Sequence, residues 1–443
     1  GYGLGVPLIA VRRTRPDAAD PREQFYPPKL SVPMTAFLRV VVEPEGTTRA
    51  NGGRLHAILE LHDPLETPDL RVAGRLVPLE RDLSTPLAYF LDQPEFNESK
   101  LATLGLLKPA KALSGLYMLE PYQPGKIPVI MVHGLWSTPV TFMEMFNDLR
   151  GDPVVHANYQ FWFYMYPTGQ PFWYSAAQMR QDLAQVRKVF DPERRQPTFD
   201  QQVLVGHSMG GLLSKLQVVD SKDDFWGIVS DKPIVQVKAD EKTLHSLQKT
   251  FYFQPNPSIR RVVTIGTPHR GSSRSNVVTQ WFGQKLITLP EKFLVRREAL
   301  LRDNPGFFRD QSVLAINTSI DSLAPDSPVL PVLYQAETPP SVTFHTIVGR
   351  VPKNELLGRL APDSDSVVKV ESAKLENAAS QIIIGADHSS VHRHPRAVLE
   401  VRRILMEHLR EVREGPPADR HRVIPVGGAT AADFEFDPSE AAR

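Results

Sequence analysis

The chain has 443 residues, of which 41% are hydrophobic and 23% charged, so it can form one large globular domain or two to three smaller ones. With 51 basic and 50 acidic residues, the formal net charge of +1 gives no reason to expect nucleic acid as a partner. It favours neutral or weakly charged substrates instead. The absence of cysteine excludes disulfides, thiolate metal sites and a cysteine nucleophile.

The sequence gives two indications of cellular location. No run approaches the roughly 20 apolar residues of a membrane span. The chain starts at Gly1 without a methionine, which suggests that an N-terminal signal or anchor has been removed. We therefore expect an extracytoplasmic or membrane-associated protein, able to bind at a membrane surface, rather than a cytoplasmic one. The oligomeric state is left open.

Residues 1–125 are expected to form an N-terminal arm and a β-rich module. Residues 1 to about 33 show little periodicity and indicate an extended arm. Strand-like runs follow at Phe37–Glu43 and Leu55–Leu61. An alternative is that this region supplies the first strands of the main sheet.

Short apolar strands alternate with amphipathic helices between residues 126 and 414. This alternation is typical of a mostly parallel, doubly wound α/β sheet with helices on both faces. The expected strands are Ile127–Val132, Tyr159–Tyr166, Val203–Val205, Arg261–Gly266, Val342–Gly349 and Gln381–Gly385. The expected helices are Pro139–Arg150, Ser175–Phe190, Met209–Val219 and Arg396–Arg413.

Two long segments interrupt this rhythm. Residues 220–257 and 271–341 lack the strand and helix alternation, and insertions of this length normally cover a site. We expect them to form helical caps on a catalytic domain that spans residues 126–414. Residues 415–443 are expected to be a peripheral tail.

A motif with a serine at its centre lies between an apolar strand and a helix. The motif is Gly206-His207-Ser208-Met209-Gly210. A nucleophile elbow requires this strand–turn–helix setting, because the tight turn leaves no room for Cβ atoms beside the serine. The helix N-terminus also favours developing negative charge. We therefore predict that Ser208 is a nucleophile, in preference to a serine in an ordinary strand-to-helix turn.

A second motif, His133-Gly134-Leu135, ends an apolar strand upstream of the elbow. In the corresponding position of this fold, a loop donates one backbone N–H to a developing oxyanion, and the residue after the nucleophile donates another. These donors are predicted to be Leu135 and Met209. His133 is expected to hold the loop by hydrogen bonds.

The acid that would orient a catalytic histidine is expected after the strand that ends at Gly349. Asp363 and Asp365 are both candidates. We prefer Asp365, because the run Asp365-Ser366-Val367-Val368 leads from a turn into apolar residues.

The general base is expected in the loop after the last strand. His388 is the first histidine there, and His392 and His394 follow it before the closing helix. We predict that His388 is the base, and the order Ser208, Asp365, His388 is the one found in α/β-hydrolases. A metal site formed by the three histidines is an alternative that no other ligand spacing supports. No cofactor is expected.

Aromatic residues near these motifs are candidates for a substrate pocket. Trp136 follows the oxyanion loop and Trp226 lies in the first insertion, and we add His207 from the elbow. The alternative for the tryptophans is packing. Further apolar residues that could cover the site are Val277-Val278, Trp281-Phe282 and Leu286-Ile287.

Four segments together resemble the bacterial lipase and esterase branch of the α/β-hydrolases. The Thr267–Gly271 segment also resembles GPI inositol-deacylase-like hydrolases, and Val132–Arg150 is similar to large bacterial α/β-hydrolases that are often predicted to be lipoproteins. Ser366 departs from the family, since lipases usually carry glycine there, and minimal lipases have no N-terminal module. The four segments, within a resemblance that spans about 126–412, are His133-Gly134-Leu135, Gly206–Gly211, Gly266–Ser272 and Asp365–Val368.

The sequence therefore predicts a serine hydrolase that cleaves small or lipid-like carboxylic esters through a Ser-His-Asp triad. One alternative is a phospholipase or acyltransferase with the same triad. A second alternative, from a different class, is a non-catalytic binding module that has kept the fold.

Overall fold

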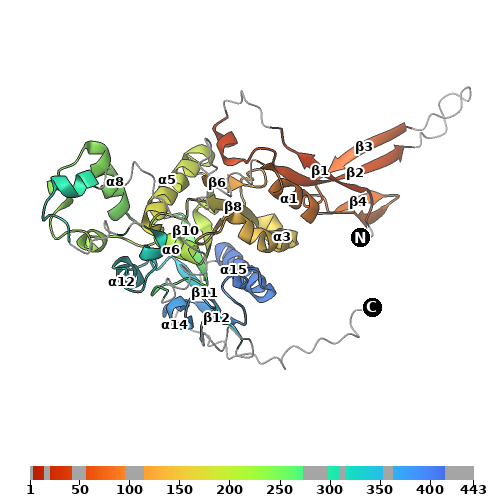
Figure 1. Ribbon diagram of the computed structural model, residues 1–443. Coiled ribbons are helices and arrows are strands. Elements are labelled where there is room, and N and C mark those ends of the chain that lie inside the picture. The colour runs from red at the N-terminus through yellow and green to blue at the C-terminus, as the bar shows by residue number, and fades with distance from the viewer. Residues whose placement is uncertain are drawn as a thin grey trace, which may run out of the picture.

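The computed structural model describes residues 3–13, 20–41, 56–94, 114–272, 298–309, 316, 318–352 and 363–414. These residues form a large α/β body, from which an N-terminal β module projects on one side (Figure 1).

The body is built on a seven-stranded sheet with the order β12-β11-β10-β9-β7-β8-β6. Neighbouring strands are parallel except for the edge strand β6, which is antiparallel to β8. Long apolar runs form the central strands because a parallel sheet is covered on both faces. The bounds are β6 Gly115–Met118, β7 Ile127–Val132, β8 Tyr159–Met165, β9 Gln202–His207, β10 Ile259–Ile265, β11 Thr343–Gly349 and β12 Ser380–Ile384.

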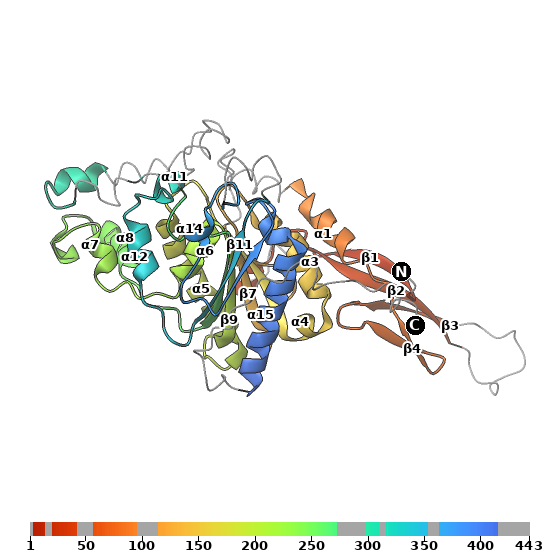
Figure 2. The same cartoon turned by 90° about the horizontal axis from the view of Figure 1, so that it is seen from below.

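Helices cover both faces of this sheet (Figure 2). Because strand side chains alternate between the faces, Ile130 and Leu204 lie in one hydrophobic core while Val129 and Val203 lie in the other. The first core includes side chains of α5 (Phe172–Phe190) and α6 (Met209–Lys215). The second includes those of α3 (Met143–Gly151), α4 (Pro153–Asn158) and α15 (Pro395–Glu414). The predicted doubly wound α/β fold is confirmed.

The N-terminal module has its own antiparallel sheet, with the order β1-β2-β3. It is formed by β1 (Val6–Val11), β2 (Ser31–Val41) and β3 (His56–His62). The expectation of an extended arm is wrong for β1, because pairing with β2 makes a strand of a segment with little periodicity of its own. The module also contains the hairpin of β4 (Asp69–Val72) and β5 (Arg75–Pro78), the 3-10 helix η1 (Pro21–Phe25) and α1 (Ser84–Leu91).

Both interpretations of the first 125 residues hold in part. β1 to β3 form the separate module, whereas β6 joins the main sheet although it precedes residue 126. The domain boundaries themselves remain a prediction. Other predicted elements shift by a few residues: α6 ends at Lys215, and residues 139–142 form a 3-10 helix (η2) before α3.

The two insertions contain short helices on one side of the body (Figure 1). The first holds α7 (Asp224–Gly227), the 3-10 helix η4 (Ile234–Gln236) and α8 (Glu241–Phe251). The second holds α11 (Ser319–Ser322) and α12 (Val329–Gln335). The apolar pairs predicted between residues 277 and 287 lie outside the described residues. No described helix has the length and apolar character needed to cross a membrane.

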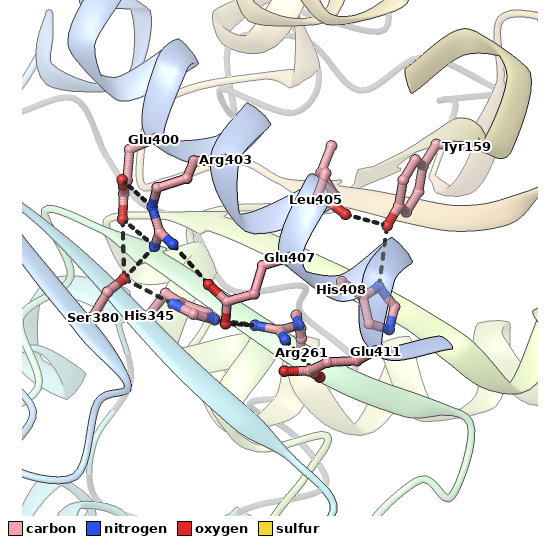
Figure 3. Close-up of polar contacts among 10 residues, drawn as sticks. All are labelled: Tyr159, Arg261, His345, Ser380, Glu400, Arg403, Leu405, Glu407, His408 and Glu411. Atoms are coloured by element: carbon pink, nitrogen blue, oxygen red, sulfur yellow. Dashed lines mark hydrogen bonds and ion pairs between the residues drawn. The ribbon is translucent and has the colours of Figure 1, made fainter. Parts of the chain in front are cut away.

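A buried ionic cluster joins α15 to the sheet (Figure 3). Arg261 of β10 is 1% exposed, and its guanidinium lies 3.2 Å from Glu407 and 2.7 Å from Glu411 of α15. It also donates to Nε2 of His345, whose Nδ1 is 2.8 Å from the Ser380 hydroxyl. Burial holds the pKa of His345 well below its usual value, so the ring is neutral and accepts this bond. The helix that follows the base loop is thereby held by charge as well as by apolar contacts.

Replacing Arg261 with leucine should lower the free energy of unfolding by about 3 kcal/mol, because Glu411 loses its cation and the buried Nε2 of His345 loses its donor. Arg403→Leu is the matched control, since Arg403 also contacts Glu407 but is about half exposed, and it should cost at most about 1 kcal/mol. Urea denaturation of both variants measures the difference. Equal losses would mean that the buried position of Arg261 confers no special stability.

Candidate active site

Ser208 lies in a strained turn between β9 and α6. Its φ of 53° and ψ of −125° are rarely adopted by a residue with a side chain. The turn is tight because α6 approaches the sheet closely. A Cβ on Gly210 would lie 2.1 Å from the carbonyl oxygen of Val132, and one on Gly206 would lie 2.5 Å from that of Gly210. Only glycine fits these positions, so the elbow motif is a packing requirement.

His388 lies beside this serine, in the loop that follows β12. Its Nε2 is 2.9 Å from the Ser208 hydroxyl oxygen, which is hydrogen-bonding distance for a general base. Its backbone N–H donates to the Asp365 carbonyl oxygen at 2.8 Å, so the loop that carries the acid also fixes the position of the base.

Asp365 contacts the other ring nitrogen of His388. Its Oδ2 is 2.7 Å from Nδ1 of His388, and the residue is 1% exposed. Its Oδ1 accepts the backbone N–H groups of Val367 at 2.9 Å and Val368 at 2.6 Å. The carboxylate is therefore held in one orientation by a turn that leaves Oδ2 for the histidine.

The same turn separates the two candidate acids. Asp363 is exposed, and it takes part in the turn through its carbonyl oxygen, which accepts the Val370 N–H. The structure brings Asp365 to the histidine, and Asp363 stays at the surface. Ser366 adopts a φ of 82°, in the region that favours glycine, which explains why the related enzymes usually have glycine there.

Charge distinguishes His388 from the other buried histidines of the site. Burial by itself lowers the pKa of His388, but the charge and hydrogen bond of the Asp365 carboxylate more than offset burial and raise this pKa above its usual value. Asp387 raises it further. The imidazole is therefore a better proton acceptor than an ordinary histidine, provided that it is deprotonated at the working pH.

The loop predicted to bind an oxyanion lies directly against the serine. A Cβ on Gly134 would lie 2.8 Å from Cβ of Ser208. Met209 begins α6, where the first N–H groups have no partner within the helix. Within the described chain, no acceptor is found for the N–H of Leu135 or of Met209. Neither N–H group is therefore occupied by an acceptor from the described residues.

His133 has the contacts expected of a residue that holds this loop. Its Nδ1 donates to the Gly134 carbonyl oxygen at 3.0 Å, and its own carbonyl oxygen accepts the hydroxyl of Tyr166 at 2.7 Å. The His133 and Tyr166 rings stack with centroids 4.3 Å apart. Burial lowers the pKa of His133 to about 4, so it stays neutral.

His207 contacts the base loop, and its expected place in a substrate pocket is not supported. The ring is buried, and Nε2 donates to the backbone carbonyl oxygen of His388 at 3.0 Å. Its other neighbour is His392, whose ring lies 4.3 Å away and whose Nε2 is 2.5 Å from the Thr141 hydroxyl. These contacts of His207 and His392 are not predicted by any pattern in the sequence, apart from the position of His207 directly before Ser208.

The two tryptophans differ in position. Trp136 follows Leu135 in the loop after β7 and is partly exposed, so its role in a substrate pocket stays a prediction. Trp226 is buried in α7, where its indole N–H donates to the Lys232 carbonyl oxygen at 2.7 Å and its ring packs on Phe251. These contacts lie within the first insertion and fit the packing alternative, so the expectation that Trp226 lines the pocket is not supported.

The histidines after β12 do not converge on one point. His388 contacts Ser208, His392 contacts Thr141, and Nδ1 of His394 accepts the Arg396 N–H at the start of α15. Across the ranges that the structure describes, no group of three or more histidines and carboxylates is arranged to hold a metal ion.

Asp365→Asn should reduce the rate at which a fluorophosphonate labels Ser208 by about 10⁴-fold, because the amide favours the wrong imidazole tautomer. Asp363→Asn is the control and should label at nearly the normal rate, since Asp363 is exposed. The labelling rates are measured by mass spectrometry of the serine peptide. Comparable rates in both variants would place the acid elsewhere.

A comparison of the sequence with models of known protein families identifies the family of this chain. Residues 129–401, more than half of the chain, match the model of the alpha/beta hydrolase family. No curated protein sequence is significantly similar to the chain.

Solved structures of bacterial lipases and esterases are similar to the chain at a low level. Bacillus licheniformis lipase BlEst2 in its mature form is 17% identical over 66% of this chain and 97% of its own, with a TM-score of 0.40. Staphylococcus hyicus lipase is 13% identical over 67% and 99%, with a TM-score of 0.40. EstA from Clostridium botulinum is 13% identical over 65% and 88%, with a TM-score of 0.36. Similarity at this level gives no information about the substrate. The match to the family model over residues 129–401 shows that the chain belongs to the alpha/beta hydrolase family.

Proposed function

We propose that this protein is a serine hydrolase that cleaves carboxylic esters through an acyl-enzyme on Ser208. The observation that carries the proposal is the unbroken line from the Ser208 hydroxyl to His388 Nε2 at 2.9 Å, and from His388 Nδ1 to Asp365 Oδ2 at 2.7 Å. Membership of a hydrolase family supports the reaction class.

The first half of the reaction forms the acyl-enzyme. The Ser208 oxygen attacks the ester carbonyl carbon while its proton passes to Nε2 of His388. Asp365 stabilises the imidazolium, and the N–H groups of Leu135 and Met209 donate to the oxyanion. When the tetrahedral species collapses, the bond to the alcohol breaks, and His388 returns the proton to the departing oxygen.

The second half regenerates the serine. A water molecule attacks the acyl carbonyl carbon, and His388 takes one of its protons. The bond to Ser208 then breaks, the serine oxygen recovers the proton, and a carboxylic acid is released. An acyltransferase would differ only in using an alcohol in place of water, so the triad does not separate the two reactions.

The formal net charge of +1 supports a neutral or lipid-like ester as substrate. A phospholipase would need the same triad and a larger acyl site.

Ser208→Ala should abolish both ester hydrolysis and fluorophosphonate labelling while leaving the far-ultraviolet circular dichroism unchanged, because the reaction loses its nucleophile. The assay uses p-nitrophenyl esters of increasing chain length beside a phospholipid and an amide. Turnover of phospholipid alone would favour the phospholipase alternative. A wild-type chain that neither turns over nor labels would be a binding module, and labelling that persists in the variant would identify another nucleophile.

The pH dependence of kcat/KM tests His388 directly. The base must be neutral to accept the serine proton, so activity should rise with pH through the pKa of the free enzyme. Because Asp365 raises the pKa of His388, the midpoint should lie above the ordinary histidine value of about 6.5. A neutral ester is used so that the substrate does not titrate. A flat profile, or a midpoint below that value, would contradict His388 as the base.

A further inference from the structure

One face of the sheet in the N-terminal module consists of apolar side chains. Residues directly opposite each other in an antiparallel sheet point to the same face, and the register pairs Leu38 with Leu59 and Ala36 with both Val6 and Leu61. The remaining positions of this face, between and beside these residues, are also apolar. We define the apolar face by its six large side chains that are 43–64% exposed: Val6, Leu8, Leu38, Val40, Leu59 and Leu61.

The opposite face of β2 and β3 carries the polar side chains Arg39, Glu60 and His62 beside apolar ones that include Ile58. Arg39 pairs with Glu60 at 2.5 Å, and Glu60 is 3.0 Å from His62. This alternation is the pattern of a sheet with one solvated face and one buried face. In the described residues, however, the apolar face is the one exposed to solvent. A contiguous patch of this kind marks an interaction surface.

We propose that the apolar face is covered by the same face of a second copy of this chain, forming a symmetric dimer. Two sheets pack face to face at about 10 Å when aliphatic side chains interdigitate, and an all-aliphatic face is complementary to itself. Six side chains exposed to this extent present on the order of 600 Å² per copy. Two copies would therefore bury on the order of 1,200 Å², which reaches the range of specific interfaces.

Charge favours a second copy of the chain over a lipid surface as the partner of the apolar face. The apolar face carries no charged side chain, and the chain has a net charge of +1, so two copies meet little repulsion. Surfaces that insert into a membrane combine aromatic anchors with basic residues, and the apolar face has neither. The dimer does not depend on the proposed catalytic function.

Adjacent residues of β3 provide the test. Leu59 lies on the apolar face, whereas Ile58 lies on the opposite face across from Arg39 and is similarly exposed, by 52% against 64%. Sedimentation velocity over a dilution series should give the wild-type chain the mass of two 49.6 kDa copies. Leu59→Glu should be monomeric under the same conditions, and Ile58→Glu should remain dimeric. Circular dichroism and the thermal midpoint check that both variants fold.

The absence of cysteine allows a second readout. Leu38→Cys introduces a single thiol on the apolar face and should form an intermolecular disulfide several-fold faster than Ile58→Cys under the same oxidant. A wild-type chain that is monomeric throughout, or equal behaviour of the two glutamate variants, overturns the proposal. A monomer that binds neutral lipid vesicles and loses this binding in Leu59→Glu also overturns it, in favour of a lipid surface.

Discussion

The close approach of α6 to the sheet is the constraint on which the site depends. Gly210 lies so near the Val132 carbonyl oxygen that no side chain fits between them, and Gly206 is also too close to Gly210 to carry a side chain. With the helix seated there, Ser208 has to adopt a positive φ in order to join β9 to α6. The strain is maintained by the packing of α6 in the apolar core, where Leu212 and Leu213 are fully buried. The same position of α6 places the N–H of Met209 beside the serine.

Parallel strands explain why residues far apart in the chain meet at this point. β9, β11 and β12 all run in the same direction, so the loops after them emerge at one edge of the sheet. Ser208, Asp365 and His388 each lie in one of these loops. The buried cluster around Arg261 holds α15, the helix that follows the base loop, so the position of His388 is fixed from both sides.

Electrostatics then selects one histidine among several. His133, His207 and His392 are buried without a carboxylate partner in the described site, and burial lowers the pKa of each, to about 4 for His133 and His392. His388 is also buried, but Asp365 raises its pKa. The other three therefore remain neutral and act through hydrogen bonds and ring contacts. Of the described histidines around Ser208, His388 is the one that contacts a carboxylate, as the proposed base requires.

The sequence by itself determined the sheet, the elbow and the order of the three candidate catalytic residues. Those features depend on local patterns: continuous apolar runs for buried parallel strands, glycines where no Cβ fits, and one histidine directly after the last strand. The tertiary structure decided what depends on contacts between distant segments. β1 exists because β2 pairs with it, and Asp365 differs from Asp363 because only Asp365 is turned inward by the N–H groups of Val367 and Val368. His207 and Trp226 contact the protein itself, a fact that no spacing in the sequence could reveal, because their partners lie in other loops and helices. In the main sheet, the apolar pattern predicts which residues are buried, and only the folded chain determines what each buried residue contacts.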